Sequence, residues 1–415
     1  MAVAQEKGLR LSPVNLIAVA CLIETLSLLT LSTFPSLIPV FQATWNLTNT
    51  EAGTISGLYF AGKLVSVTLL LAMMDRWDGR PMFLAGLFVG FLSGIGFVIA
   101  TGFWSAGLWR FLQGFALGAT YIPGLKILTD HLPPDYRSRG TSFYTATYYL
   151  AAGASYFLAL ESEPVFGWQG SFFLASLGPF LGLIIARQVI PSSPPPPNEG
   201  GETVRIFDFT GTLKNRKAIG FSLLYGLHSM ELIAFTSWLV PFLAFSHMLQ
   251  APDSPGSDWS LGIVAAIVLT AGLPASICFN EVAHRIGRQA LIVAVMVVSA
   301  VVAVAFASIP SWNYAVVVFL AFVFSMSIAA DSSAITGGVL SVADPAHKGR
   351  TMSLYSLIGF GGAFLGPVIF GAVLDLAGGE HDQAAWIAAF AAIACLVLTG
   401  PVIVWRWIGF SEKIH

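Results

Sequence analysis

Twelve long apolar stretches follow one another along this chain of 415 residues, and they constrain its fold more than any other feature. A helix needs about 20 predominantly apolar residues to cross the hydrocarbon core of a bilayer. Only 10% of the residues are charged, whereas a typical soluble domain has about 25%. The sequence therefore predicts an integral membrane protein that crosses the bilayer at residues 14–40, 51–73, 81–101, 104–128, 141–160, 170–190, 218–246, 260–280, 289–309, 313–342, 352–376 and 384–405.

The apolar stretches are expected to be helices and not strands. They lack the alternation of apolar and polar residues that a transmembrane barrel requires, and an open sheet would leave unpaired backbone groups in lipid. Glycines recur at helical spacing instead, as at Gly86, Gly90 and Gly94, and small residues four apart allow helices to pack closely. We therefore predict an all-α bundle of twelve transmembrane helices.

The basic residues indicate how the bundle is oriented. Every Lys and Arg outside the membrane stretches lies in or beside every second connection, and the intervening connections contain none. The basic set is Lys7, Arg10, Arg76, Arg80, Arg137, Arg139, Arg187, Arg205, Lys214, Arg216, Lys217, Arg285, Arg288, Lys348, Arg350, Arg406 and Lys413. By the positive-inside rule these connections and both termini are cytoplasmic. The short loops and the lack of a transit peptide favour a bacterial inner (plasma) membrane.

A polar segment divides the chain into two parts of six stretches each. Residues 191–217 include the run Pro194–Pro197 and a basic end, which is typical of a linker. We predict an N-terminal six-helix bundle at 1–190, a cytoplasmic linker at 191–217 and a C-terminal six-helix bundle at 218–415.

The two parts also repeat each other in sequence. Asp75–Arg80 corresponds to His284–Arg288 at an offset of about 209 residues, and Arg139–Tyr144 corresponds to Arg350–Tyr355 at an offset of 211. Two matches at nearly one offset indicate an internal duplication. Transporters that rock around a central site are often built from such repeats.

These motifs make the chain resemble the major facilitator superfamily over essentially its whole length. Asp75–Arg80 is similar to the cytoplasmic signature of that family, with one extra residue before Gly79, and His284–Arg288 is a second copy in which His284 replaces an Asp. Arg110, Gln113 and Gly114 match the Arg-x-x-Gln-Gly pattern of the fourth span. The resemblance implies a secondary transporter working by alternating access. It also implies gating roles for Asp75, Arg76, Arg80, His284, Arg285 and Arg288.

Apart from Glu51, Arg187 and Asp375 near the ends of their stretches, six charged residues lie inside the apolar stretches. A charge there costs ~2.5–3.5 kcal/mol on insertion scales and needs a partner or a water-filled cavity. The six are Glu24, Lys63, Arg110, Lys126, Glu231 and Asp331. Spans one, four, seven and ten line the central cavity in the family that the chain resembles, and most of these charges lie there. His228 precedes Glu231 by three residues and shares its helical face. We predict that Glu24, His228, Glu231 and Asp331 couple transport to protons.

Lys63 and Arg110 are the predicted anion binders, since an ammonium attracts a carboxylate as a point charge and a guanidinium matches it as a planar fork. Gln113, Tyr121 and Tyr225 complete the predicted substrate site. The expected activity is proton-coupled uptake of a small organic anion. Two alternatives remain: proton-coupled efflux of an amphipathic or cationic compound, and a non-transporting sensor or assembly protein on a transporter fold.

The sequence contains no motif for an activity other than transport. The sequence has no phosphate-binding loop for ATP, no hydrolase motif and no cluster with metal-ligand spacing, so we expect neither an enzyme, a cofactor nor a metal. The formal net charge of −2 gives no indication of a nucleic-acid partner. The expected partners are a small-molecule solute, protons and the lipid bilayer, and we expect a monomer.

Overall fold

The structure, a computed structural model, describes residues 11–74, 77–192, 209–251 and 255–410 and has no strand in these ranges. Its helices are α1 (Pro13–Ser27), η1 (Leu28–Thr30), α2 (Thr33–Ser36), α3 (Ile38–Trp45), α4 (Asn49–Met74), α5 (Gly79–Val98), α6 (Phe103–His131), α7 (Pro134–Val189), α8 (Thr210–Leu213), α9 (Arg216–Met248), α10 (Leu261–Thr270), α11 (Gly272–Ile286), α12 (Arg288–Ala307), α13 (Tyr314–Ala329), α14 (Ser332–Val342), η2 (Pro345–His347), α15 (Lys348–Leu376), α16 (Gln383–Val397), α17 (Thr399–Ile403) and η3 (Val404–Ile408). The all-α prediction is confirmed.

Ten helical segments of the described chain are long and apolar enough to cross a membrane. One of them, α7, has 56 residues and is interrupted at Gly167, whose φ of 68° lies in the left-handed region that favours glycine. It therefore consists of two successive helices. In addition, α6 has 29 residues but is less apolar, because Arg110, Gln113 and Lys126 lie within it. The architecture is consistent with the twelve predicted crossings.

Four predicted crossings are broken and not continuous, and one of them, 384–405, falls in α16, α17 and η3 with a separation at Leu398. Residues 14–40 form α1, η1, α2 and the start of α3, and residues 313–342 form α13 and α14. Residues 260–280 fall in α10 and α11, which separate at Ala271. Pro274 explains this last break, because a proline ring clashes with the carbonyl four residues earlier, here that of Thr270.

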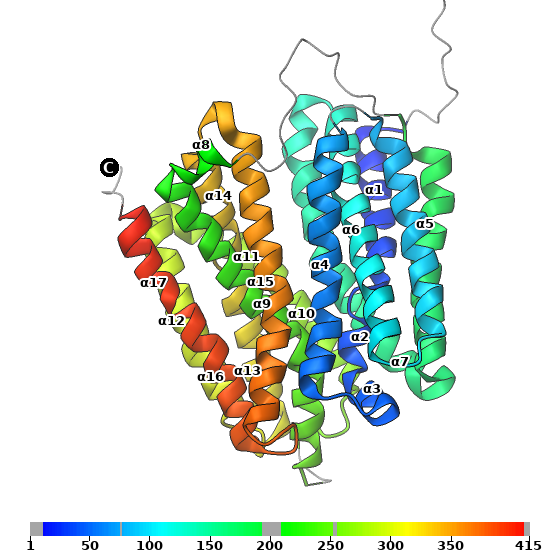
Figure 1. Cartoon of the computed structure of the whole chain (residues 1–415), viewed down its shortest axis with the longest axis vertical. Coiled ribbons are helices and arrows are strands. Elements are labelled where there is room, and N and C mark those ends of the chain that lie inside the picture. Colours follow the sequence, from blue (N-terminus) through cyan, green and yellow to red (C-terminus); the bar gives the residue numbers. More distant parts are fainter. Residues whose placement is uncertain (1–10, 75–76, 193–208, 252–254, 411–415) are drawn as a thin grey trace, which may run out of the picture.

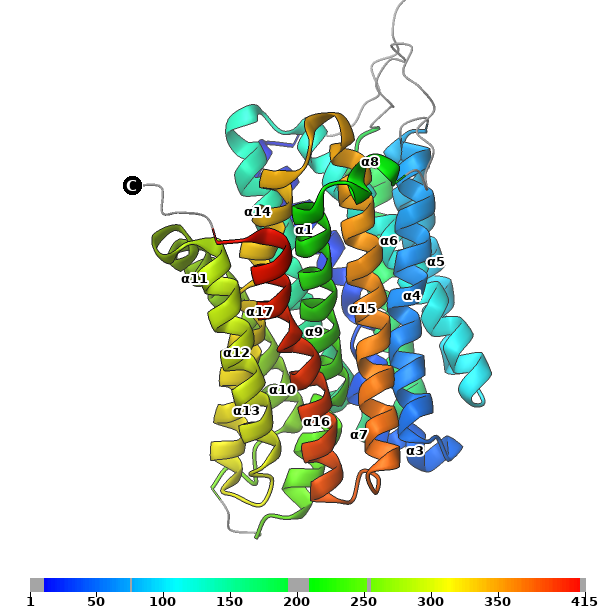
Figure 2. The same ribbon diagram turned by 60° about the vertical axis from the view of Figure 1, so that its left-hand side comes forward.

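The helices form two groups that follow the order of the chain. Figure 1 places α1 and α4–α7 on its right-hand side and α8, α9 and α11–α17 on its left-hand side. In both Figures 1 and 2 α4 lies beside α15, which it contacts directly. The predicted domain boundaries stay a prediction, and residues 193–208 of the linker lie outside the described residues.

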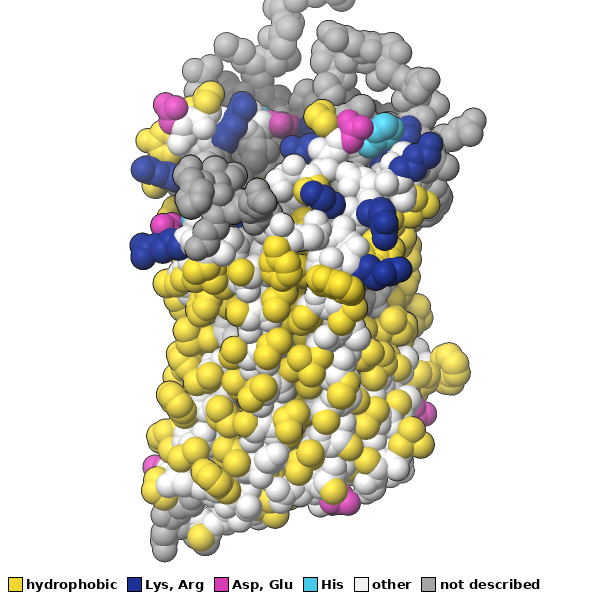
Figure 3. All heavy atoms as spheres, turned by 90° about the vertical axis from the view of Figure 1, so that its left-hand side faces the viewer, with side chains coloured by type: hydrophobic (Ala, Val, Ile, Leu, Met, Phe, Trp, Pro, Cys, Tyr) yellow, Lys and Arg dark blue, Asp and Glu magenta, His cyan; other side chains and the backbone are white. Residues whose placement is uncertain are grey.

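The surface shows which part of the molecule meets the bilayer. On the face in Figure 3, Lys and Arg side chains gather near the upper end and a continuous apolar band lies below them. The described C-terminal residues lie at this same end (Figure 1). This distribution agrees with a cytoplasmic location for the basic connections.

Glycines allow α4 and α15 to approach each other closely. A Cβ atom added at Gly53 would lie 2.1 Å from the carbonyl oxygen of Pro367, and one added at Gly57 would lie 2.4 Å from that of Phe364. Both clashes are with backbone, which cannot rotate away. Small residues are therefore required on this face of α4.

We expect Gly57→Ala to destabilise the protein by about 1–3 kcal/mol through overpacking, although alanine is the better helix former by about 1 kcal/mol. The matched control is Gly361→Ala on α15, because a Cβ there would meet nothing within 4 Å. The unfolding temperature in detergent should fall for the first variant and stay or rise for the second. Equal shifts would contradict the close approach of the two helices.

Candidate functional site

A central cavity of about 730 Å³ lies between the two groups of helices. Its wall comes from α4, α6 and α7 on one side and from α9, α11, α14 and α15 on the other. Ser142 and Asn280 of this wall are only a few residues from the basic connections at 137–139 and 285–288. The cavity therefore extends toward the basic, predicted cytoplasmic end of the molecule.

Lys63 on α4 presents its ammonium to this cavity inside a ring of aromatic side chains. Its Nζ atom lies 4.5 Å from the ring centre of Phe360, 5.2 Å from that of Tyr121 and 6.0 Å from that of Tyr148. Lys63 is only 8% exposed, and it forms no ion pair within 4.0 Å with any described residue. Cation–π contacts compensate only part of the cost of burying a charge.

Glu24 on α1 belongs, like Lys63 on α4, to the first group of helices. It is fully buried, and its Oε2 atom accepts hydrogen bonds from Tyr144 at 2.9 Å and from Ser27 at 3.4 Å. Its Oε1 atom has no partner among the described residues. Lys63 is the cation that acts on Glu24 electrostatically, but the two groups do not form an ion pair.

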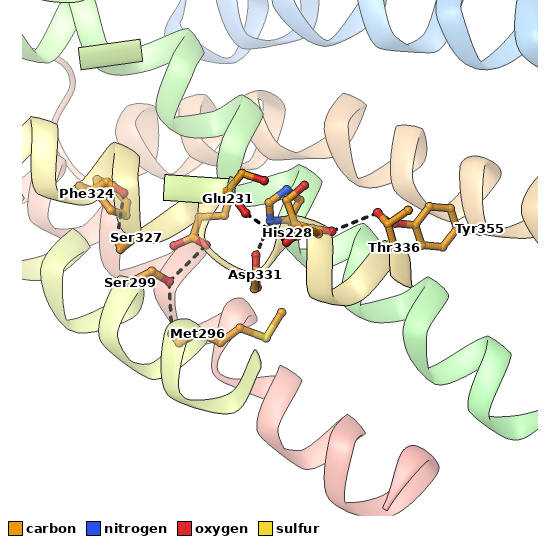
Figure 4. A network of polar contacts seen from close by, with 12 residues as sticks. His228, Glu231, Met296, Ser299, Phe324, Ser327, Asp331, Thr336 and Tyr355 are labelled. Atoms are coloured by element: carbon orange, nitrogen blue, oxygen red, sulfur yellow. Dashed lines mark hydrogen bonds and ion pairs between the residues drawn. The ribbon is translucent and has the colours of Figure 1, made fainter. Parts of the chain in front are cut away.

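The second group of helices holds a separate acidic cluster (Figure 4). His228 and Glu231 come from α9, and Asp331 approaches them from the break between α13 and α14. The Nδ1 atom of His228 lies 2.8 Å from Oδ1 of Asp331. Glu231 accepts a hydrogen bond of 3.3 Å from Ser299, and its Oε1 atom has no partner among the described residues.

His228 links this cluster to the central cavity. It lines the cavity together with Tyr225, whose ring stacks on that of Tyr355 with 4.1 Å between the ring centres. The hydroxyl of Tyr355 in turn contacts Thr336 at 2.8 Å. The imidazole ring of His228 therefore contacts both the cavity and the carboxylate of Asp331.

Arg110 is not in the wall of the central cavity. It lines a separate pocket that shares Phe60, Tyr148 and Tyr149 with that cavity, and it holds the break in the first span. Its guanidinium donates to the carbonyl oxygens of Thr30 and Leu31 at 2.9 and 3.0 Å, and to Gln113 at 2.9 Å. A broken helix leaves such carbonyls without partners. Arg110 and Gln113 therefore satisfy backbone and each other, whereas Lys63, Tyr121 and Tyr225 of the predicted substrate site line the cavity.

The opposite end of the cavity is closed by contacts between the two groups of helices. Asp375, at the end of α15, accepts hydrogen bonds from the backbone N–H groups of Asn49 and Thr50 at 3.0 and 2.8 Å and from both side chains at 2.8 and 2.6 Å. Asn49 also donates to Glu380 at 2.8 Å. The Asp375 carboxylate thus caps the N-terminus of α4, where backbone N–H groups and the helix dipole favour an anion. We call these four residues the outer closure.

The predicted cytoplasmic gating residues do not tie the two groups together here. Arg80 donates to the carbonyl oxygen of Arg187, and Arg288 donates to that of Gly337, both at 2.9 Å and both within one group. His284 and Arg285 are exposed. Asp75 and Arg76 lie outside the described residues. The gating roles stay a prediction.

Residues missed by the sequence analysis include Phe360, Ser299 and Asp375. The first two are ordinary residues in apolar helices and gave no signal. Asp375 did carry one: a carboxylate in the last turn of a helix opposes the dipole of that helix. Such a charge needs a partner from another element, here the start of α4.

A helical membrane protein with a cavity between two groups of helices, open toward one side and closed at the other, has the architecture of an alternating-access transporter. A family model described as Major Facilitator Superfamily matches residues 20–357 and, in a second match, residues 230–413. The chain belongs to the Major Facilitator Superfamily, a family of membrane transporters and not of enzymes.

The relatives and structures compared with this chain share 30% identity with it or less. An uncharacterized MFS-type transporter of Enterobacter sp. (strain 638) is 24% identical over 66% of this chain and 68% of its own length. YcaD of Salmonella newport (strain SL254), also named an MFS-type transporter, is 30% identical over 42% of this chain and 46% of its own length.

Two solved structures share the fold. A mutant of the nucleoside transporter NupG has a TM-score of 0.78 at 15% identity, covering 95% of this chain and all of that chain. A bacterial homolog of the human lysosomal transporter Spinster has a TM-score of 0.68 at 16% identity, covering 96% of each chain.

We expect Asp375→Asn to weaken the outer closure, because a hydrogen bond to a charged group is worth about 1.5–3 kcal/mol. A cysteine is placed at Thr236 of α9, which lines a pocket between the two groups of helices, in a variant with its native cysteines replaced by serine. It should then react about tenfold faster with a membrane-impermeant thiol reagent added outside. Asp382→Asn is the control, since Asp382 caps α16 within its own group. Equal labelling in the two variants would contradict a closing role for Asp375.

Proposed function

We propose that this transporter carries a small organic anion with an aromatic or otherwise planar body, together with protons, toward the cytoplasm. One observation carries the proposal: Lys63 is a buried cation in the wall of the central cavity and has no ion-pair partner among the described residues. A carboxylate or similar anion would supply the missing charge.

The surroundings of Lys63 support a planar body for the solute. Phe60, Tyr148, Tyr149, Tyr225 and Phe360 line the same cavity, and flat rings pack well against such side chains. The hydroxyls of the tyrosines offer hydrogen bonds at the edge of the solute. This combination of one cation with several aromatic rings suits an aromatic carboxylate better than a sugar or a simple cation.

Proton coupling follows because Glu24 and the solute anion both interact with the Lys63 ammonium. In the empty cavity Lys63 balances part of the charge of Glu24, with which it interacts electrostatically. When a solute anion binds Lys63, Glu24 loses this compensation and takes up a proton at its unpartnered oxygen. The solute and the proton then move together, because closing the cavity to water costs less free energy when the charges inside it are balanced.

The acidic cluster at His228, Glu231 and Asp331 is a second place where protons can bind. Glu231 is 4% exposed and has no basic partner within 4.0 Å among the described residues. A carboxylate in such surroundings is costly unless it is protonated. His228 connects the cluster to the cavity and is the expected route for the proton.

Lys63→Gln should raise the KM for an anionic solute at least tenfold, because a charge-assisted hydrogen bond worth about 1.5–3 kcal/mol is lost. The assay is uptake by purified protein in liposomes of a panel that includes aromatic carboxylates, neutral nucleosides and organic cations. Lys126→Gln is the matched control, since Lys126 is paired with Asp130 at 2.6 Å on α6. Transport of nucleosides or cations alone, unaffected by Lys63→Gln, would overturn the anion proposal.

Glu24→Gln should abolish solute-driven proton movement and leave exchange of solute across the membrane in place, because the proton that accompanies the solute binds at Glu24 under our proposal. An internal pH dye measures the first activity, and exchange of labelled for unlabelled solute measures the second. Glu281→Gln, an exposed acid on α11, should behave like the parent. Solute-driven alkalinisation of the lumen in place of acidification would indicate antiport and hence efflux, and no response to any solute would favour a non-transporting protein.

A further inference from the structure

An apolar groove of about 540 Å³ lies between α1 and the first part of α7, outside the central cavity. α1 and α7 each contribute one face at helical spacing. The lining residues are Val14, Ile17, Ala18 and Cys21 of α1, Tyr136, Arg139, Phe143, Ala146, Thr147 and Leu150 of α7, and Leu273 of α11.

The groove opens to the surface that the bilayer covers. Val14 is 60% exposed, Phe143 is 61% exposed and Leu150 is 53% exposed, although all three belong to segments that are long and apolar enough to cross a membrane. The medium beside these side chains is therefore hydrocarbon. A hollow of this kind is filled most readily by a flexible acyl chain.

The groove has a single cationic end. Arg139 lies in the first turns of α7, at the predicted cytoplasmic boundary, and Tyr136 lies one turn before it. Arg137 nearby donates to the carbonyl oxygen of Leu132 at 3.1 Å. Arg139, in contrast, is exposed and makes no hydrogen bond or ion pair with the described residues. An anionic headgroup would lie beside it at the depth where phosphates of the inner leaflet are found.

We propose that this groove binds one anionic phospholipid of the cytoplasmic leaflet, with an acyl chain between α1 and α7 and its phosphate at Arg139 and Tyr136. An anionic headgroup suits Arg139 better than the N-terminal residues 1–10 do, because Lys7 and Arg10 outnumber the one acid there, Glu6, and would bring net like charge to Arg139. The groove does not depend on the solute proposed for the central cavity.

The position of the groove gives the bound lipid a consequence for transport. Ala146 and Leu273 line both the groove and the central cavity. Leu273 belongs to the second group of helices, whereas the other lining residues belong to the first. A lipid in the groove therefore touches both groups and covers the side of the cavity that adjoins them.

The test is native mass spectrometry of the full-length protein released from detergent with equal amounts of phosphatidylglycerol and phosphatidylcholine of the same acyl chains. The parent should retain phosphatidylglycerol roughly fivefold better, the ratio that one Arg near an anionic headgroup provides. Arg139→Gln should bring the ratio close to one. Ala18→Trp, which fills the groove from its exposed wall, should reduce retention of both lipids.

Arg187→Gln is the matched control, because it removes the same charge at the other end of α7, outside the groove, and should keep the ratio of the parent. Three results would overturn the proposal: equal retention of the two lipids by the parent, an equal loss in Arg187→Gln and Arg139→Gln, or full retention of phosphatidylglycerol by Ala18→Trp. None of these results bears on the role of Lys63, which the uptake assay measures separately.

Discussion

The bilayer offers no water to polar groups, so each buried charge and each broken helix must be satisfied inside the protein. The break in the first span meets this constraint through Arg110, which bonds the carbonyls of Thr30 and Leu31, and through Ser155, which accepts from the N–H of Ser32 at 3.0 Å. Arg110 thereby acts as part of the scaffold. Buried side-chain atoms without a partner among the described residues include one carboxylate oxygen each of Glu24 and Glu231, which have a role in transport under our proposal. They also include Nε of Arg80 and Arg110 and the hydroxyls of Ser56, Ser66 and Thr212.

The two ends of the molecule differ in how the two groups of helices contact each other. At the outer end the helix groups are in direct contact, through the glycine face of α4 against α15 and through the carboxylate of Asp375 on the N-terminus of α4. At the basic end Arg80 and Arg288 bond carbonyls of their own group, and the cavity lies between the groups. Such a difference lets one end open without breaking contacts that hold each group together. It is the physical basis for alternating access in this fold.

The charged residues of the site could be found from the sequence because they are conspicuous in apolar stretches. The sequence could not show which of these charged residues lie close together in the structure. Lys63 and Arg110 look equivalent in the sequence, yet one faces the cavity and the other faces a helix break. Likewise Asp331 contacts His228 at the point where the tenth span is interrupted. No proline lies beside this interruption, so the sequence did not predict it. The internal repeat did indicate Tyr144 and Tyr355 as equivalent positions, and both hydroxyls make polar contacts in the structure.

The sequence by itself determined the helical membrane fold, the near positions of the crossings and the end that carries positive charge, because hydropathy, helix length and charge placement act locally along the chain. Only the tertiary structure decided which polar groups face the cavity, which end is closed and where Asp375 finds its partner 326 residues away in the chain. Those outcomes depend on contacts between distant helices, and no local pattern encodes the distance between two atoms on different helices.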